Sequence, residues 1–217
     1  MNRCCHDHGP PSAVSGTFRR ALVVALALNG GMFGIEVAAG LAAGSVALQA
    51  DALDFLGDAA NYALSLAVLA LAPIQRARAA LVKALSMALL GAWVIGTALV
   101  HALRDVVPDA PTMGVVGVLA LAVNVGVALM LYRFRVGDAN MRSTWLCSRN
   151  DAIGNLAVLG AALGVAGTGT PWPDLAVATV MASLALAGAA TVIRVARAEI
   201  RRERIDARRF DIIPTTE

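Results

Sequence analysis

Apolar residues occur along the chain in six long stretches, at about 18–40, 46–72, 79–103, 112–132, 141–167 and 174–196. Each stretch is long enough to supply the roughly 20 residues that a helix needs to cross about 30 Å of hydrocarbon. A spanning segment of this kind is helical, because lipid offers no water to unpaired backbone groups. The pattern therefore predicts an all-α membrane protein with six transmembrane helices.

Composition and charge agree with this class. The 217 residues are 58% hydrophobic and 15% charged, whereas a soluble domain carries about 25% charged residues. The net charge of +3 does not indicate nucleic-acid binding, because the basic residues follow alternate connections between the stretches and form no continuous patch. We therefore expect the lipid bilayer, and no nucleic acid, as a partner.

Lysine and arginine also predict the orientation. They gather before the first stretch, between the second and third (where Lys83 is counted with Arg76 and Arg78), between the fourth and fifth, and after the sixth. The remaining connections hold only Arg104. Cytoplasmic loops carry the excess of Lys and Arg. Both termini are therefore predicted to be cytoplasmic, in a protein of the bacterial inner (plasma) membrane.

The stretches divide the chain into three parts: a cytoplasmic tail at 1–17, a six-helix transmembrane domain at 18–198 and a charged cytoplasmic tail at 199–217. The first tail contains Cys4, Cys5, His6 and His8. These residues are soft metal ligands on the cytoplasmic side, so they either capture ions near the entrance or belong to a dispensable tail. They do not form a zinc finger, because no second ligand pair follows at finger spacing.

Ionisable residues at membrane depth are functional candidates by default, because a charge there costs at least about 2.5–3.5 kcal/mol. Asp54 and Asp58 are four residues apart, so both carboxylates lie on one helix face. Cys147 and Asp151 repeat this step in the fifth stretch. At 1.5 Å per residue both pairs lie about 10–18 Å into the membrane. The four side chains are predicted to form a tetrahedral divalent-metal site.

Two simpler interpretations stay open. The carboxyl groups can be protonated and hydrogen-bonded to polar residues of neighbouring helices, which would make them contacts between helices only. Cys147 can be a small buried filler beside a site that water completes. If Cys147 is a ligand, its thiolate favours Zn²⁺, Cd²⁺ or other thiophilic ions over Mg²⁺, Ca²⁺ or Mn²⁺.

Further polar residues lie on the same faces as the predicted site. Asp51, seven residues before Asp58, belongs to a second layer around the metal, to an outer release path or to a hydrogen bond with the preceding loop. Glu36, seven residues after Asn29, either lines the release path or forms a structural pair, and Asn155 continues the face of Asp151. Two remaining residues are given structural roles: Arg149 is predicted to face away from the metal, and His101 to lie at the outer interface.

These motifs resemble those of the cation diffusion facilitators. Residues 45–58, SVALQADALDFLGD, are similar to the family pattern S-x-A-L-x-A-D-A-x-[HD]-x-x-x-D, and residues 147–155, CSRNDAIGN, to H-x-x-x-D-x-x-x-[SN]. Asn29 and Glu36 match the spacing N-x6-E of the first span, and Trp172 to Asp174 resemble the start of span six. The resemblance covers residues 20–198. It implies six helices, a homodimer and proton-coupled export of divalent metal from the cytoplasm.

The sequence departs from the family at three points. Asp54 stands where zinc and cadmium exporters often have His, and Cys147 replaces the usual His of span five. After Arg197 only a charged tail follows, in place of the cytoplasmic metal-binding domain of about 80 residues that is typical of the family. We therefore expect a short member in which transmembrane helices hold the homodimer together.

The charge of the site predicts its mechanism. Three carboxylates and a thiolate repel one another in a low-dielectric medium, so the empty site should bind protons. Metal must then displace protons, and protons from outside can displace metal. The prediction is a metal/proton antiporter, not an enzyme, that exports Zn²⁺ first and Cd²⁺, Co²⁺ or Fe²⁺ next. The alternative is a membrane metal-binding receptor that uses the same site without transport.

Overall fold

The computed structural model describes the backbone of residues 16–67, 73–134 and 139–210, and the side-chain surroundings of these residues except for 73, 139–150, 204 and 206–210. Six helices follow one another in the chain. They are α1 (Gly16–Ala43), α2 (Val46–Ala67), α3 (Pro73–Arg104), α4 (Ala110–Tyr132), α5 (Ala139–Thr168) and α6 (Trp172–Phe210). The described ranges contain no strand, so the prediction of an all-α fold with six helices is confirmed.

Within the described residues, five of the helices contain a segment long and apolar enough to cross a membrane, and α2 is the helix for which no such segment is found. Helix α2 has 22 residues but carries three carboxylates, Asp51, Asp54 and Asp58. Two boundaries differ from the sequence-based expectation. Helix α3 begins at Pro73, six residues earlier than expected, and α6 continues to Phe210 through much of the predicted C-terminal tail. With 39 residues and a rise of 1.5 Å each, α6 is about 58 Å long.

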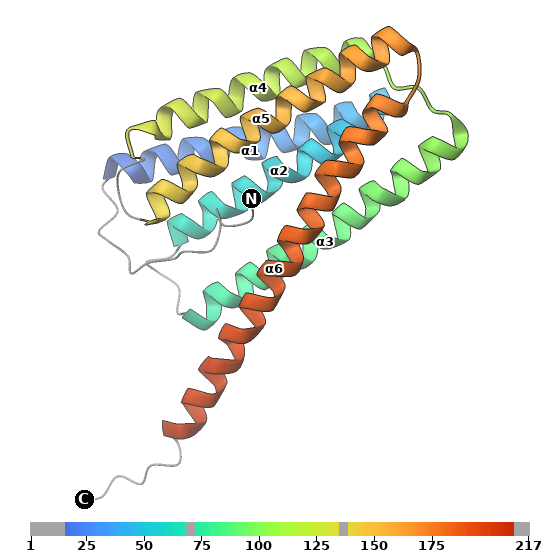
Figure 1. The fold of residues 1–217 in the computed structure, drawn as a ribbon. Coiled ribbons are helices and arrows are strands. Elements are labelled where there is room, and N and C mark those ends of the chain that lie inside the picture. The colour runs from blue at the N-terminus through green and yellow to red at the C-terminus, as the bar shows by residue number, and fades with distance from the viewer. Residues whose placement is uncertain (1–15, 68–72, 135–138, 211–217) are drawn as a thin grey trace, which may run out of the picture.

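The helices form two groups (Figure 1). Helices α1, α2, α4 and α5 lie together as a bundle, while α3 and α6 run side by side as a pair that crosses the bundle at an angle. The two groups meet near the end where α5 leads into α6 and α3 leads into α4, and they diverge toward the opposite end. The orientation predicted from the basic residues makes the meeting end the outer one.

Two apolar clusters hold the helices together. The larger one joins all six helices and includes Val46 and Leu48 of α2, Val94 of α3 and Val158 of α5. The smaller one joins the start of α1 to the end of α2 and α4 through buried Phe18, Leu22, Tyr62, Val127 and Leu131. Tyr62 is thereby buried in the second half of α2, close to the predicted site.

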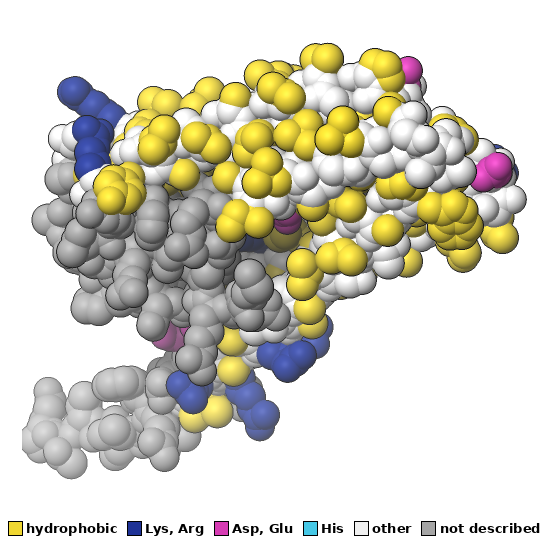
Figure 2. Space-filling model, turned by 45° about the horizontal axis from the view of Figure 1, so that its top comes forward, with side chains coloured by type: hydrophobic (Ala, Val, Ile, Leu, Met, Phe, Trp, Pro, Cys, Tyr) yellow, Lys and Arg dark blue, Asp and Glu magenta, His cyan; other side chains and the backbone are white. Residues whose placement is uncertain are grey.

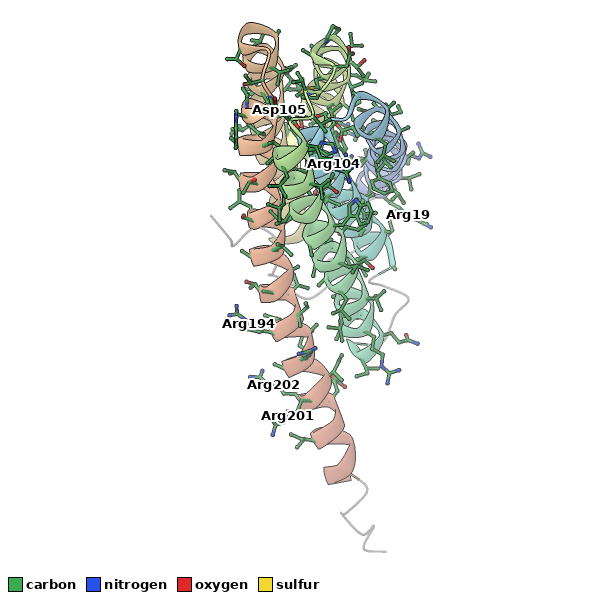
Figure 3. All side chains as sticks on the ribbon, turned by 90° about the vertical axis from the view of Figure 1, so that its right-hand side faces the viewer. Arg19, Arg104, Asp105, Arg194, Arg201 and Arg202 are labelled. Carbon is green, nitrogen blue, oxygen red and sulfur yellow. The ribbon has the colours of Figure 1, made fainter. Side chains whose placement is uncertain are left out.

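Outward-facing side chains suit a lipid environment. Hydrophobic side chains are spread over the described part of the face that Figure 2 shows. Large ones such as Leu89 and Leu103 of α3 are 73% and 79% exposed. Charged side chains lie toward the ends: Arg201 and Arg202 lie on the protruding part of α6, and Arg104 lies near the opposite end of the α3–α6 pair (Figure 3). This distribution is the one expected of a membrane-spanning fold.

Asp174, at the start of α6, joins the two groups at the outer end. Its carboxylate accepts hydrogen bonds from the Ser45 hydroxyl at 2.7 Å, the Val46 N–H at 2.8 Å and the Ala47 N–H at 3.1 Å. The first N–H groups of a helix have no partner within it, so Asp174, from another helix, supplies hydrogen-bond acceptors to the buried N–H groups at the start of α2. Gly44, with φ of 66°, provides the left-handed turn between α1 and α2 that glycine adopts readily.

Asp109 caps α4 in the outer connection between α3 and α4. Its side chain accepts a hydrogen bond from the Thr112 N–H at 3.0 Å, as an N-cap residue does. The hydrogen bonds to Thr112 hold the pKa of this exposed carboxyl below its usual range. The cap therefore stays ionised at neutral pH and is lost only as the pH falls through the lowered pKa.

Candidate metal site

Asp58 of α2 and Asp151 of α5 lie close together. Asp58 is 6% exposed, and its carboxyl group is within hydrogen-bonding reach of the Asp151 carboxyl group. The Tyr62 hydroxyl, one turn further along α2, donates a hydrogen bond of 2.8 Å to Asp58 Oδ2. A buried acid of α2 and a partly buried acid of α5 thus converge, as the sequence-based site requires.

The structure says less about the other two predicted ligands, Asp54 and Cys147. Asp54 lies one turn before Asp58 on α2, is partly buried and interacts electrostatically with Glu36. Cys147 lies on α5, and its side chain is outside the described residues. Among the side chains that are described, no three of the types His, Cys, Asp and Glu gather closely enough to hold a metal ion. The four-residue site therefore stays a prediction.

Glu36 of α1 and Asp51 of α2 form a second acidic pair toward the outer side. Both are almost fully buried, at 0% and 1% exposure, and their carboxyl groups lie within hydrogen-bonding reach of each other. An ionised carboxylate only accepts hydrogen bonds, so this contact is a hydrogen bond when one of the two carries a proton. Within the described part of the chain, neither Glu36 oxygen has a separate donor.

The remaining predicted residues are less closely connected to the site. Asn29 is buried on α1, and its side-chain amide donates to the Ala25 carbonyl at 2.8 Å. Asn155 is fully buried on α5, one turn beyond Asp151, with no hydrogen-bond partner among the described atoms. His101, which is partly buried near the end of α3, interacts electrostatically with Asp174. The Arg149 side chain and the run of Cys4, Cys5, His6 and His8 lie outside the described residues.

Lys83 is a residue of the site that sequence reasoning missed, because it was counted with the cytoplasmic basic residues. It lies on α3, donates a hydrogen bond to the Asn61 side chain of α2 and interacts electrostatically with Asp58. The early start of α3 at Pro73 moves Lys83 ten residues into the helix. The apolar pattern gives no signal for this position, because the expected third stretch begins at 79, only four residues before Lys83.

The fold and these contacts define a class: an integral membrane protein whose buried acids meet between transmembrane helices. Residues 22–201 match the cation efflux transmembrane domain. The chain is 29% identical, over 188 residues, to the metal cation efflux system protein CzcD of Cupriavidus metallidurans, and equally to the cation efflux system protein CzcD of an Alcaligenes species. The chain belongs to the cation diffusion facilitator family.

The extent of these matches differs between the partners. Each match covers 81% of this chain but only 58% of the length of the CzcD protein. The family match at residues 22–201 contains all six helices of the structure, except for the start of α1 and the end of α6. The family, the helical membrane fold and the location in a membrane are therefore supported over most of this chain. The activity of the longer relatives is not assigned to this chain by the matches.

Proposed function

We propose that the protein exports divalent metal cations from the cytoplasm in exchange for protons, through a site made of Asp54, Asp58, Cys147 and Asp151. The observation that carries this proposal is the approach of Asp58 and Asp151, on two different helices, in the interior of a membrane-spanning fold. The names of the two relatives, which are efflux proteins for metal cations, support the same direction of transport.

The chemistry follows from charge balance. A divalent cation neutralises two carboxylates, and in its absence protons can take its place. Ligands must lose their protons to bind metal, so binding and proton release are coupled. Export of M²⁺ against a cytoplasm-negative potential costs about 2.3 kcal/mol per charge per 100 mV. The return of protons through the same site offsets this electrical cost without ATP.

The donor set favours Zn²⁺ as the cargo, with Cd²⁺, Co²⁺ and Fe²⁺ as further substrates. Two or three carboxylates alone suit many divalent ions, whereas a thiolate selects thiophilic ones. Asp51 and Glu36 lie on the outer side of the site, so we place them on the release path. The working unit in this proposal is a homodimer held by transmembrane helices.

The decisive test is transport by the purified full chain in proteoliposomes with an imposed pH gradient. We expect Zn²⁺ uptake into vesicles with an acidic interior, with proton efflux recorded at the same time by a pH-sensitive dye. A panel of Zn²⁺, Cd²⁺, Co²⁺, Fe²⁺ and Mn²⁺ ranks the cargo. Metal flux that is independent of the pH gradient would contradict proton coupling, and binding without flux would favour a metal-binding receptor.

The thiolate of Cys147 has its own test. We expect Cys147→Ser to reduce Cd²⁺ transport by about tenfold or more and Mn²⁺ transport much less, because sulfur contributes more to the binding of soft ions. The measurement is the initial flux of each ion in proteoliposomes that contain equal amounts of protein. Equal losses for both ions would show that Cys147 is not a ligand.

A further inference from the structure

Lys83 lies at the same depth as the candidate site. Helix α2 ends at Ala67, nine residues after Asp58, and α3 begins at Pro73, ten residues before Lys83. At 1.5 Å per residue these distances are about 14 and 15 Å from the cytoplasmic ends of the two helices. Lys83 therefore lies close to the level of Asp58 along the two helices, and a cation beside a transmembrane site is costly unless it meets an anion.

Two successive contacts bring α3 against this part of α2. A side chain added at Gly57 would meet the Met87 methyl group at 3.1 Å, so the Met87 side chain of α3 packs against α2 just before Asp58. One turn toward the cytoplasm, Lys83 donates a hydrogen bond to Asn61. Asn61 is three residues after Asp58, so the ammonium group of Lys83 is held on the cytoplasmic side of Asp58.

The charge of Lys83 acts on the acid that the metal site depends on. Lys83 interacts electrostatically with Asp58, while Tyr62 donates a hydrogen bond to the same carboxylate. Charges that are partly buried are screened weakly. A positive charge at this position attracts the metal-free carboxylate of Asp58 and repels a metal ion that binds to this carboxylate.

We propose that the positive charge of Lys83 beside Asp58 weakens the binding of divalent metal at Asp58 and so promotes the release of the metal. The inference rests on the proposed function, since it assigns Asp58 to the cargo site. It assigns to Lys83, which is not a ligand, an effect on the affinity of the site for metal. Lys83 is in this sense a positioning and tuning residue: it stabilises the metal-free carboxylate and disfavours the metal-bound one.

Equilibrium binding of Cd²⁺ to the purified full chain, measured by titration calorimetry at fixed pH and salt, tests the proposal. We expect Lys83→Gln and Lys83→Met to bind Cd²⁺ about tenfold more tightly than the wild type, which corresponds to 1.4 kcal/mol. Lys83→Arg keeps the charge and should stay near the wild-type affinity. If the role were only to hold α3 against α2, the neutral variants would bind no more tightly than the wild type.

Arg78 provides a matched control on the same helix. It is exposed and lines a pocket with Arg197 and Arg201 between α3 and α6, so it faces away from α2. Arg78→Gln removes one positive charge at a similar place in the sequence and should leave the Cd²⁺ affinity unchanged. An equal gain from Arg78→Gln would show a general effect of surface charge and would overturn the specific role of Lys83.

A double-mutant cycle locates the effect at Asp58. In the Asp58→Asn background, Lys83→Gln should no longer raise the affinity, because the carboxylate through which the charge acts is absent. A persistent gain would overturn the proposal. If the wild type binds and transports metal but Lys83→Gln changes nothing, this inference fails alone, whereas a wild type that neither binds nor transports metal overturns the proposed function.

Discussion

Replacement of Asp58 by Asn is expected to abolish metal transport while the protein still inserts into the membrane. The amide keeps the shape of the carboxyl group but cannot carry its charge, and the loss of one charged member of a buried set costs about 3–5 kcal/mol. Metal affinity should therefore fall by more than about 100-fold. Asp151→Asn should have the same effect, because Asp151 and Asp58 lie within hydrogen-bonding reach of each other.

Proteoliposome flux and calorimetric binding measure this loss together. Asp105→Asn is a suitable control, because Asp105 is an exposed carboxylate beyond the outer end of α3 and should not affect transport. The amount of inserted protein and its elution from a sizing column show whether each variant is folded. Transport at the wild-type rate by either Asp58→Asn or Asp151→Asn would mean that the metal binds elsewhere.

The second large effect is expected for Asp174. Its carboxylate is 1% exposed and accepts three hydrogen bonds at the start of α2. Asp174→Ala leaves the Val46 and Ala47 N–H groups buried without this partner, and each unsatisfied buried group costs about 1–3 kcal/mol. We expect the unfolding free energy to fall by about 3 kcal/mol or more, seen as a lower unfolding temperature in detergent.

The contrast with Asp109 makes this test specific. Asp109 caps α4 near the same end of the molecule but is exposed to solvent. Asp109→Ala should therefore lower the unfolding temperature much less than Asp174→Ala. Equal effects of the two substitutions would show that the link between α6 and α2 adds nothing beyond an ordinary helix cap.

The helices themselves could be predicted from the sequence, because the membrane restricts apolar stretches of this length to helices. The four-residue step from Asp54 to Asp58 and the depth of Asp151 predict that acids of α2 and α5 face each other. Asp58 and Asp151 lie within hydrogen-bonding reach of each other, while the four-ligand site stays a prediction. The likeness to the cation diffusion facilitators was also readable from these motifs, and the match over residues 22–201 confirms it.

Lateral contacts between helices were beyond the sequence. Periodicity tells which face of a helix a residue occupies but not which neighbour that face meets. Lys83 was therefore grouped with the cytoplasmic basic residues, although it reaches Asn61 of α2. For the same reason the hydrogen bonds of Asp174 to α2, 127 to 129 residues earlier in the chain, could not be derived. The ends of α3 and α6 were also missed, since arginines mark the limit of an apolar stretch and not of a helix.

The three carboxylates of α2 have a consequence for biogenesis. Each aspartate near the middle of a segment opposes its transfer from the translocation channel into lipid by about 2.5–3.5 kcal/mol, so α2 is poorly suited to partition alone. Only Gly44 and Ser45 separate it from the strongly apolar α1. The first two helices should consequently be integrated together as one hairpin, with Glu36 and Asp51 already shielding each other from the acyl chains.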